Sequence, residues 1–480
     1  MLRFVARTLG LAALAVLPGA SAASCSSGPP PGRVCTIAPP APSSWRLVGD
    51  GTLFRDALGR VVFLRGVNAG GRSKFAPYMP FDYTDSSDFP GKLAKYMERA
   101  QSWGIDAMRV PFTWAALEPV QGQDDADWLS RYDQLVDSAW AHGIWVVVDF
   151  HQDIYSEVYC GDGFPAWTVA NPPAPHHDCP QWSLQYFNDP NVIGAFDAFW
   201  ANGSTVQDAY AAAWDRMVAR YKDKPGVVGF EPLNEPSSGS AENDAFSVTT
   251  LPDFYTKMVA RIRAAAPTSL VFVDPTGLDG VGASTKMARP VGDGIVFAPH
   301  YYPLTSNPEA VLPGLQRWAD VGKQWNVPVF VGEFGATNLL PSTGPYMAGQ
   351  WAGFDTVGLS GTEWEYSVAT ELWNAETDTI VMPDGTEYPV IAQAIMRPFA
   401  RAVAGSGIAQ SWDYDGRVFS LSYAPENGGI TEVQLPARAF DLGYSVELEG
   451  GCYDVTSAPG RMLLQPDPGA TAVTLKVSAQ

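Results

Sequence analysis

The sequence is short of basic residues. Its 480 residues include 31 Lys and Arg against 51 Asp and Glu, which gives a formal net charge of −20. Nucleic acids are bound through clustered positive charge, so this composition predicts no nucleic-acid partner. Only 17% of the residues are charged and 46% are hydrophobic, a balance that excludes an intrinsically disordered chain and provides for a large core.

Long hydrophobic runs are also missing. Beyond the N-terminus, no apolar stretch reaches the roughly 18 to 20 residues of a membrane-spanning helix. At the N-terminus, two arginines precede an apolar run at 9–17 and the small residues Ala20-Ser21-Ala22. This order predicts a cleaved signal peptide over residues 1–22 and a secreted protein, which we expect to be a monomer. A rival interpretation makes Cys25 a lipidated cysteine that anchors the protein.

Cysteine and histidine are scarce, with five of each. No Cys-x-x-Cys pair is present, so the sequence predicts no zinc site, and we expect neither a metal nor another cofactor. Export to an oxidising compartment favours disulfides. The pairs closest in sequence are Cys25 with Cys35 and Cys160 with Cys179, and we predict both. Cys452 would then be left over and buried.

Short β-rich runs alternate with helical patterns along most of the chain. Several of the runs are continuously apolar, which is typical of strands buried on both faces of a parallel sheet. The eight predicted strands are 61–68, 107–112, 145–151, 227–232, 270–275, 295–301, 327–334 and 361–366. Helical periods lie between most of them, so we predict an α/β fold with a (β/α)8 TIM barrel. An open doubly wound sheet is the alternative, but no Gly-x-Gly-x-x-Gly turn follows the first strand.

The barrel is predicted to occupy residues 45–405, after a Pro/Ser-rich lead at 23–44. Past Gly405 the pattern changes to short alternating runs separated by Gly, Pro, Asn and Asp. Such runs predict a small C-terminal antiparallel β-sandwich over 406–480.

Polar and ionisable residues occupy one predicted strand end after another, where a TIM barrel collects its catalytic side chains. Packing alone does not explain such a series. Counted from the first strand to the eighth, the candidates are Lys74, Arg109, His151, Asp153, Asn234, Glu235, His300, Tyr302, Glu333 and Trp364.

Two of these candidates, Glu235 and Glu333, follow strands that face each other across the barrel mouth. A retaining glycoside hydrolase needs a carboxylic acid that protonates the leaving oxygen and a carboxylate that attacks the anomeric carbon. The two groups stand about 5 to 5.5 Å apart. The pair therefore predicts glycoside hydrolysis with retention.

The motifs around both glutamates resemble those of glycoside hydrolase family five. The segments are Phe-Glu-Pro-Leu-Asn-Glu-Pro at 230–236 and Phe-Val-Gly-Glu-Phe-Gly at 330–335. In that family the acid/base follows strand four and the nucleophile lies on strand seven, which implies these roles for Glu235 and Glu333. The family's other active-site positions are matched in order by Arg109, His151, Asn234, His300, Tyr302 and Trp364.

Four further segments are similar to a narrower group, the endoglycoceramidases. They are Asp-Phe-His-Gln-Asp at 149–153, Trp-Ser-Leu-Gln-Tyr at 182–186, Trp-Glu-Tyr at 364–366, and 397–405 ahead of the sandwich. Those enzymes are secreted and release the intact oligosaccharide from ceramide. The resemblance implies a glycosphingolipid substrate, although relatives acting on glucosylceramide or sterol glucosides share part of these motifs.

Physical roles follow for the implied residues. Burial and the negative charge of Glu333 should raise the pKa of Glu235, and contacts from Arg109 and Tyr302 should keep Glu333 ionised. We expect the remaining candidates to meet the sugar: Asn234 at its 2-hydroxyl, Trp364 stacked beneath the ring, and Lys74, Asp153, His151 and His300 at other hydroxyls. The two histidines would otherwise orient the carboxylates or serve the structure alone.

Two neighbouring glutamates are rivals for the catalytic roles. Glu365 is the rival nucleophile, but alternation along a strand places it on the face opposite to Trp364. Glu231, four residues before Glu235, is the rival acid.

The insertion at 153–190 is far longer than a usual βα loop and is rich in aromatic residues. Either it holds a lipid aglycone and touches a membrane or micelle surface, or it folds on a small core of its own. Three hypotheses for the whole chain remain open: a glycosphingolipid endoglycosidase, a β-glucanase or mannanase, and a non-catalytic binder built on a barrel.

Overall fold

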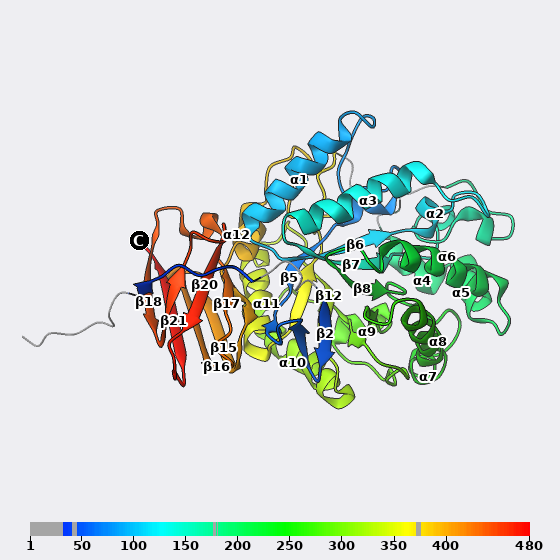
Figure 1. Cartoon of the computed structure of the whole chain (residues 1–480). Coiled ribbons are helices and arrows are strands. Elements are labelled where there is room, and N and C mark those ends of the chain that lie inside the picture. The colour runs from blue at the N-terminus through cyan, green and yellow to red at the C-terminus, as the bar shows by residue number, and fades with distance from the viewer. Residues whose placement is uncertain (1–31, 41–45, 176–178, 180, 371–375) are drawn as a thin grey trace, which may run out of the picture.

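The computed structural model describes residues 32–40, 46–175, 179, 181–370 and 376–480. The predicted signal peptide and Cys25 lie outside these ranges. Figure 1 shows a barrel wrapped by helices at one end of the molecule and layered β-sheets at the other. Within the described ranges, no helix combines the length and the apolar character needed to cross a bilayer.

Nine parallel strands form the barrel, and the predicted TIM-barrel fold is confirmed. Two short strands, β10 and β11, follow each other at one position, and a bridge between Phe297 and Val329 closes the ring beside them. The barrel strands are β5 (Arg65–Asn68), β6 (Ala107–Phe112), β7 (Trp145–Phe150), β8 (Val227–Glu231), β9 (Leu270–Val273), β10 (Ile295–Phe297), β11 (His300–Tyr301), β12 (Phe330–Phe334) and β13 (Ser360–Glu363).

Helices surround the barrel and bury their apolar faces against it. In α3, for example, buried Trp128, Tyr132, Leu135 and Ala139 repeat every three to four residues. The helices are α1 (Phe89–Trp103), α2 (Trp114–Leu117), α3 (Ala126–Ala141), α4 (Gln185–Asn188), α5 (Pro190–Trp200), α6 (Thr205–Tyr221), α7 (Asn243–Val248), α8 (Thr250–Ala265), α9 (Gly277–Gly282), α10 (Pro308–Trp325), α11 (Thr343–Val357) and α12 (Pro389–Ile395).

The first predicted strand, 61–68, is in fact two strands in two sheets. Its first part, β4 (Val61–Val62), pairs with β3 (Leu53–Asp56) and β14 (Phe399–Val403), and only β5 belongs to the barrel. Phe54, Val62 and Leu64 pack with the inward-facing side chains at the lower end of the barrel. The segment before β5 therefore covers the N-terminal end of the barrel, and the chain joins the ring of strands only at β5.

The C-terminal region is a sandwich of two mainly antiparallel sheets that share one hydrophobic core. Segments from both ends of the chain lie side by side in the larger sheet (Figure 1), so 47–62 contributes to it although it precedes the barrel. The boundaries at 45–405 and 406–480 remain a prediction. The larger sheet runs β1 (Arg33–Val34), β19 (Gly451–Asp454), β20 (Arg461–Pro466), β17 (Thr431–Gln434), β14, β4, β3 and β2 (Leu47–Asp50); the smaller runs β15 (Gly405–Asp413), β16 (Val418–Pro425), β21 (Val473–Ala479) and β18 (Tyr444–Glu449).

One of the two predicted disulfides is present and the other is wrong. Cys160 is bonded to Cys179, as predicted. Cys35, however, is bonded to Cys452, which is 417 residues away, instead of to Cys25. The reason is tertiary, because β1 pairs in parallel with β19 and brings the two sulfurs together.

Candidate active site

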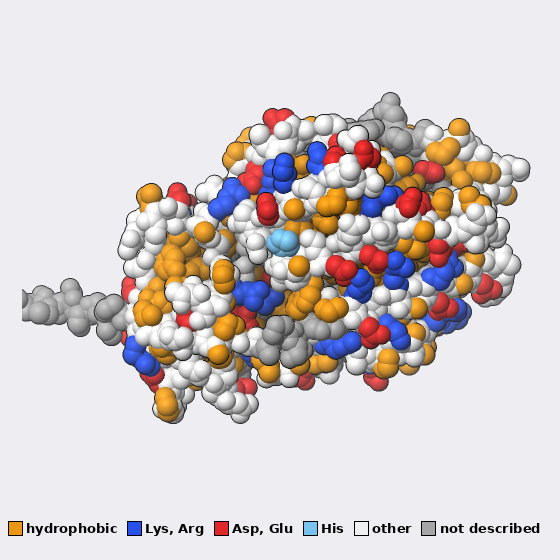
Figure 2. Space-filling view, turned by 45° about the horizontal axis from the view of Figure 1, so that its top comes forward, with side chains coloured by type: hydrophobic (Ala, Val, Ile, Leu, Met, Phe, Trp, Pro, Cys, Tyr) orange, Lys and Arg blue, Asp and Glu red, His pale blue; other side chains and the backbone are white. Residues whose placement is uncertain are grey.

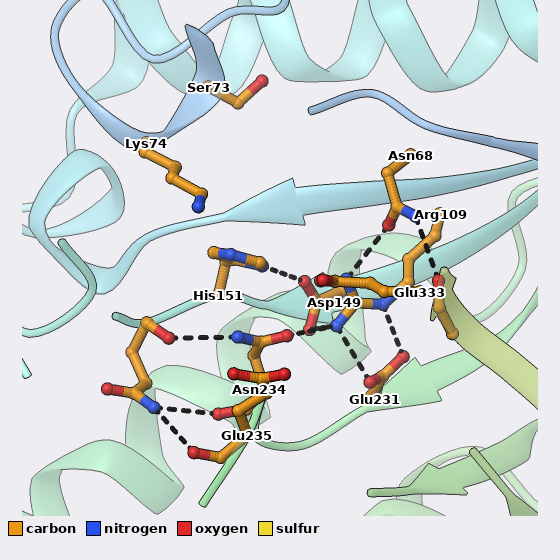
Figure 3. Close-up of polar contacts among 12 residues, drawn as sticks. Asn68, Ser73, Lys74, Arg109, Asp149, His151, Glu231, Asn234, Glu235 and Glu333 are labelled. Atoms are coloured by element: carbon orange, nitrogen blue, oxygen red, sulfur yellow. Dashed lines mark hydrogen bonds and ion pairs between the residues drawn. The ribbon is translucent and has the colours of Figure 1, made fainter. Parts of the chain in front are cut away.

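All ten candidate residues gather at the carboxyl ends of the barrel strands. Figure 3 shows Lys74, Arg109, His151, Asn234, Glu235 and Glu333 among them. Arg109, His300 and Glu333 lie within strands, and Lys74 lies in the short helix η2 (Gly71–Lys74) after β5. The other six directly follow β7, β8, β11 and β13. The parallel order of the strands places all these ends on one rim, which explains the convergence.

Arg109 is the centre of the network and is completely buried. Its guanidinium donates two hydrogen bonds of 2.9 Å to Glu231 and one of 2.7 Å to Glu333. It also reaches Oδ1 of Asn234 at 2.7 Å and Oδ1 of Asp149 at 3.0 Å. A planar guanidinium with five donors is the side chain that can satisfy so many acceptors at once, and it fixes the position of each.

Glu333 receives donors at both carboxylate oxygens. Arg109 bonds Oε1, and the hydroxyl of Tyr302 donates to Oε2 over 3.0 Å. Nδ1 of His300 lies 3.5 Å from the same Oε2. Hydrogen bonds to both oxygens hold the carboxyl group of Glu333 in one orientation.

Glu235 lies on a strained turn after β8, with φ at +39°, a backbone region that residues other than glycine rarely adopt. Its backbone N–H donates to Oδ2 of Asp274 over 2.9 Å, and Oε1 lies 2.8 Å from Nδ1 of His300. Gly277 leaves room for the carboxyl group, because a Cβ there would stand 2.9 Å from Oε2. The turn thus aims the carboxyl group into the barrel mouth.

The pKa of Glu235 is raised to about 7, first by burial and then by the negative charge of Asp153. The predicted upward shift of the pKa of Glu235 is confirmed. The largest contribution from a neighbouring charge, however, comes from Asp153 and not, as predicted, from Glu333. A carboxyl group with a pKa near 7 can both release and accept a proton under neutral conditions.

The two carboxyl groups are close. An oxygen of Glu235, one of Glu333 and a nitrogen of His300 all lie within 4.8 Å of one another. This spacing suits the retaining arrangement of about 5 to 5.5 Å, whereas inverting enzymes need about 6.5 to 9.5 Å to admit a water molecule.

A second group of charges lies beside the pair. Nζ of Lys74 donates to Asp153 over 2.7 Å and to Glu376 over 3.2 Å. His151 bonds Asp149 at 2.9 Å; although burial alone would lower the pKa of His151, hydrogen bonds to Asp149 and Asp153 raise it to about 10. Trp364 stacks on His151 with 5.2 Å between ring centres. Nζ of Lys74 lies 4.4 Å from the ring centre of Trp364.

Both rival glutamates point elsewhere. Glu365 accepts hydrogen bonds from Gly71 and Ser367, away from Glu333. Glu231 is buried and gripped by both arms of the Arg109 guanidinium. Neither carboxyl group is free to meet a substrate.

Sequence reasoning missed four residues that belong to the network. Asn68 bonds Arg109, Asp149 joins Arg109 to His151, Asp274 contacts Glu235, and Glu376 contacts Lys74. Asn68 ends β5 and Asp274 follows β9, so the same argument from strand ends would have found them. Glu376 lies in a long segment after the eighth strand and carries no comparable signal.

Among the described residues, three groups of His, Asp and Glu side chains bring ligand-type atoms within 4.8 Å: His151 with Asp153 and Asp162, Glu231 with Asp274 and His300, and Glu235 with His300 and Glu333. In each group a carboxylate is already paired with Lys74 or Arg109. These positive side chains supply the charge that a metal ion would bring, so we assign no metal ligand.

A cavity of about 510 Å³ adjoins Glu235 and is also bordered by Tyr302. Its apolar lining includes Trp182, Leu184 and Phe187 from the insertion, with Leu278 from α9 facing them. Behind this lining, Tyr155 and Phe164 of the insertion are fully buried and stacked 4.2 Å apart, and both belong to the main hydrophobic core of the barrel. The interpretation that the insertion folds on a small core of its own is therefore wrong, and its contact with a lipid aglycone stays a prediction.

The described Lys and Arg side chains lie scattered among Asp and Glu on the face that Figure 2 shows. This distribution agrees with the acidic composition.

Comparison with known proteins identifies the family. Residues 69–369 match the family described as Cellulase (glycosyl hydrolase family 5), and 397–477 match the glycoside hydrolase family 5 C-terminal domain. Endoglycoceramidase I of Rhodococcus hoagii (strain 103S) is 29% identical over 472 residues, 92% of this chain and 89% of that protein. A glucosylceramidase of Aspergillus fumigatus is 34% identical over 139 residues, but over only 26% of this chain and 18% of its own.

Solved structures of similar proteins support the same family. The lactosyl-enzyme intermediate of endo-glycoceramidase II from Rhodococcus sp. superposes with a TM-score of 0.74 at 25% identity, covering 89% of this chain and 99% of its own. A covalent glycosyl-enzyme is the intermediate of the retaining mechanism. The chain belongs to glycosyl hydrolase family 5, as an endoglycoceramidase-like retaining glycoside hydrolase.

Proposed function

We propose that this protein is a secreted endoglycoceramidase, which hydrolyses the β-glycosidic bond between the oligosaccharide and the ceramide of glycosphingolipids. The observation that carries the proposal is the position of the apolar cavity directly beside Glu235 and Tyr302. A polysaccharide-cleaving relative needs a polar groove on that side, where the next sugar would lie. An apolar cavity suits a lipid aglycone instead.

The first chemical step forms the glycosyl-enzyme. Glu333, held by Arg109 and Tyr302, attacks the anomeric carbon of the first sugar. Glu235 donates its proton to the glycosidic oxygen, and the bond between that oxygen and the anomeric carbon breaks. Ceramide then leaves as a neutral alcohol through the cavity.

The second step returns the enzyme to its first state. Glu235, now a carboxylate, takes a proton from a water molecule, and the water oxygen attacks the anomeric carbon. The bond to Glu333 breaks and the oligosaccharide leaves with its original anomeric configuration. Two inversions at one carbon account for the retention.

A group of polar side chains beside the cavity is our candidate for the oligosaccharide side. Lys74, Asp153 and His151 offer donors and acceptors that suit sugar hydroxyls, and Asn234 lies next to Glu235, where the 2-hydroxyl would be. Trp364 is only 3% exposed. A sugar would therefore contact the edge of the Trp364 ring. Stacking on the face of the ring would require Lys74 to move first.

Exposed apolar side chains around the mouth support brief contact with a membrane or micelle. They are Phe187, Leu184, Leu278, Leu339 and Leu304, the last of which is 89% exposed, and all lie in the connections that follow barrel strands. With a net charge of −20, attraction to an anionic surface is unfavourable, so apolar contact would have to bring the enzyme to its substrate.

The decisive experiment is incubation with a panel of glycosphingolipids, glucosylceramide, steryl glucoside and β-glucans, with mass spectrometry of the products. The proposal requires intact oligosaccharide together with ceramide. Release of glucose from glucosylceramide alone would favour the glucosidase relatives, and shortened glucans would favour a polysaccharide hydrolase. No product from any substrate would favour a non-catalytic barrel.

A further inference from the structure

Asp274, directly after β9, is buried at the back of the active site with 1% of its surface exposed. Two contacts link it to the proposed acid/base. Its Oδ2 accepts the backbone N–H of Glu235 over 2.9 Å, and the same oxygen lies 3.4 Å from Nε2 of His300. The other nitrogen of that imidazole, Nδ1, contacts Oε1 of Glu235. Asp274 therefore reaches Glu235 by two routes, through the main chain and through His300.

The place of Asp274 is firmly set. The hydroxyl of Tyr255, from α8, lies 2.9 Å from its carbonyl oxygen and 3.2 Å from that of Leu233, which ties two strand ends together. On the opposite side Gly332 makes room for the imidazole, because a Cβ there would stand 3.1 Å from Nε2 of His300. The imidazole therefore lies between the two carboxyl groups, with Nε2 toward Asp274 and Nδ1 toward Glu235.

The charge of the imidazole follows from its surroundings. Burial, opposed by the negative charge of Glu333, lowers the pKa of His300 to about 4, so the ring is neutral and carries one proton. That proton is either on Nδ1 or on Nε2. Nδ1 faces Glu235 at 2.8 Å and Glu333 at 3.5 Å. A lone pair there would oppose the Glu235 carboxylate that exists after the first chemical step, whereas an N–H would stabilise it.

A proton on Nδ1 leaves a lone pair on Nε2, which needs a donor. The groups that face Asp274 are the carboxyl groups of Glu231 and Glu235, the imidazole of His300, the hydroxyl of Tyr255 and, further away, the guanidinium of Arg109. Burial and then the negative charges of Glu231 and Glu235 raise the pKa of Asp274 well above its usual range. A neutral Asp274 has an O–H to offer to Nε2.

We propose that Asp274 is a positioning residue: as a neutral carboxylic acid it holds His300 in the Nδ1–H tautomer and thereby orients Glu235 for both proton transfers. This rests on the proposed role of Glu235. The Nδ1–H bonds Oε1 of Glu235, so the transferable proton is on Oε2, toward the substrate. When that proton has left, the same N–H stabilises the carboxylate that will activate water.

The tautomer is measured directly in the wild-type enzyme by two-dimensional ¹⁵N–¹H NMR of ¹⁵N-histidine-labelled protein. The chain has only five histidines, and a His300→Gln sample assigns the signal of interest. We expect His300 to be neutral at pH 7 with its proton on Nδ1. A proton on Nε2, or a charged ring at pH 7, would overturn the proposal. This readout needs no substrate, so it stands even if glycosphingolipids are not hydrolysed.

Asp274→Asn is the informative variant. An amide oxygen can accept the Glu235 N–H but cannot donate to His300, so the ring proton should move to Nε2 and the Nδ1 lone pair should face Glu235. The neutral form of Glu235 is then favoured, and the basic limb of the pH–rate profile should move upward by about one unit. Turnover of a substrate with a poor leaving group should fall about 10- to 100-fold, part of the usual contribution of acid–base catalysis. Formation of the covalent intermediate from an activated aryl glycoside should change little.

Glu363→Gln is the matched control, since Glu363 is equally buried but its carboxyl group accepts its hydrogen bond from Trp351 of α11, outside the ring of strands. It should leave the tautomer and the pH profile unchanged. Equal behaviour of the two variants would reduce Asp274 to a packing residue and refute its proposed role. If Asp274→Asn does not fold, the wild-type tautomer decides.

Discussion

Nη1 of Arg109 lies 2.7 Å from Oε1 of Glu333, and the guanidinium that makes this contact is inaccessible to solvent. A permanent positive charge at this distance is screened less by a buried environment than it would be in water. The same guanidinium is shared with Glu231 and Asp149, which are themselves completely buried. The proposed nucleophile is therefore part of a charge cluster whose members depend on one another.

We predict that Arg109→Lys destabilises the fold as well as abolishing activity. An ammonium group cannot reach all the acceptors that the planar guanidinium satisfies, so Glu231 or Asp149 would be left as a buried, unpaired charge. Such a loss typically costs about 3 to 5 kcal/mol. Urea unfolding measures it. Arg220→Lys, at an exposed pair with Asp133, is the control and should change stability by less than about 1 kcal/mol. Equal effects at both sites would contradict the shared-charge interpretation.

Glu333→Ser should abolish hydrolysis while the protein remains folded by circular dichroism. The hydroxyl of Ser cannot form the glycosyl-enzyme, and the side chain is too short to reach the anomeric carbon. Azide in the cleft vacated by the carboxylate should restore turnover of an activated substrate and yield a product of inverted configuration. Glu365→Ser should stay active, because its carboxyl group faces Gly71. If instead the Glu333 variant stayed active and azide rescued the Glu365 variant, Glu365 would be the nucleophile.

Glu235→Ala should separate substrates by leaving group. Ceramide is a poor leaving group and needs the proton, so its release should fall by about 10² to 10⁴. An activated aryl glycoside should still form the covalent intermediate, which then accumulates because water has lost its base.

The wild-type pH profile tests the same assignment. Since the pKa of Glu235 is raised to about 7, the acid is protonated below this pH, and activity should fall as pH rises through 7. In Glu235→Ala this limb should vanish. A limb that persists, together with equal losses for both kinds of substrate, would point to another acid.

Replacing Cys35 and Cys452 together with Ser should destabilise the C-terminal sandwich. The bond joins β1 to β19 and closes a loop that contains almost the whole chain. Loss of a native disulfide usually costs about 2 to 5 kcal/mol. The transition measured by scanning calorimetry should move to lower temperature, with little change in the pH optimum because the site is remote. An unchanged transition would show that strand pairing alone holds the N-terminal segment.

Phe187→Ala should weaken binding of the aglycone. This side chain lines the cavity and is 56% exposed, so its removal should not disturb the core. We expect KM for a ceramide-linked substrate in detergent micelles to rise several-fold, while kcat/KM for a short aryl glycoside stays unchanged. Leu442→Ala, an exposed leucine in the sandwich, is the control. An equal loss for both substrates would argue against a lipid-binding cavity.

The sequence by itself determined the barrel and the rim on which the candidate residues gather. Continuous apolar runs predict parallel strands, and parallel strands place their carboxyl ends on one rim, so residues as distant as Arg109 and Glu333 could be expected to meet. The helical periods, the C-terminal sandwich and the bond between Cys160 and Cys179 are equally local signals. The roles assigned to Glu235 and Glu333 remain proposals.

Other features were decided only by the tertiary structure. The run 61–68 divides between two sheets because Val62 and Leu64 fill the barrel floor, and Cys35 meets Cys452 because β1 pairs with β19. Likewise, Asp153 rather than Glu333 is the negative charge that raises the pKa of Glu235. Pattern and spacing predict which strand ends share a rim. They do not contain the distances between side chains and across sheets, and those distances set strand partners, disulfide partners and electrostatic neighbours.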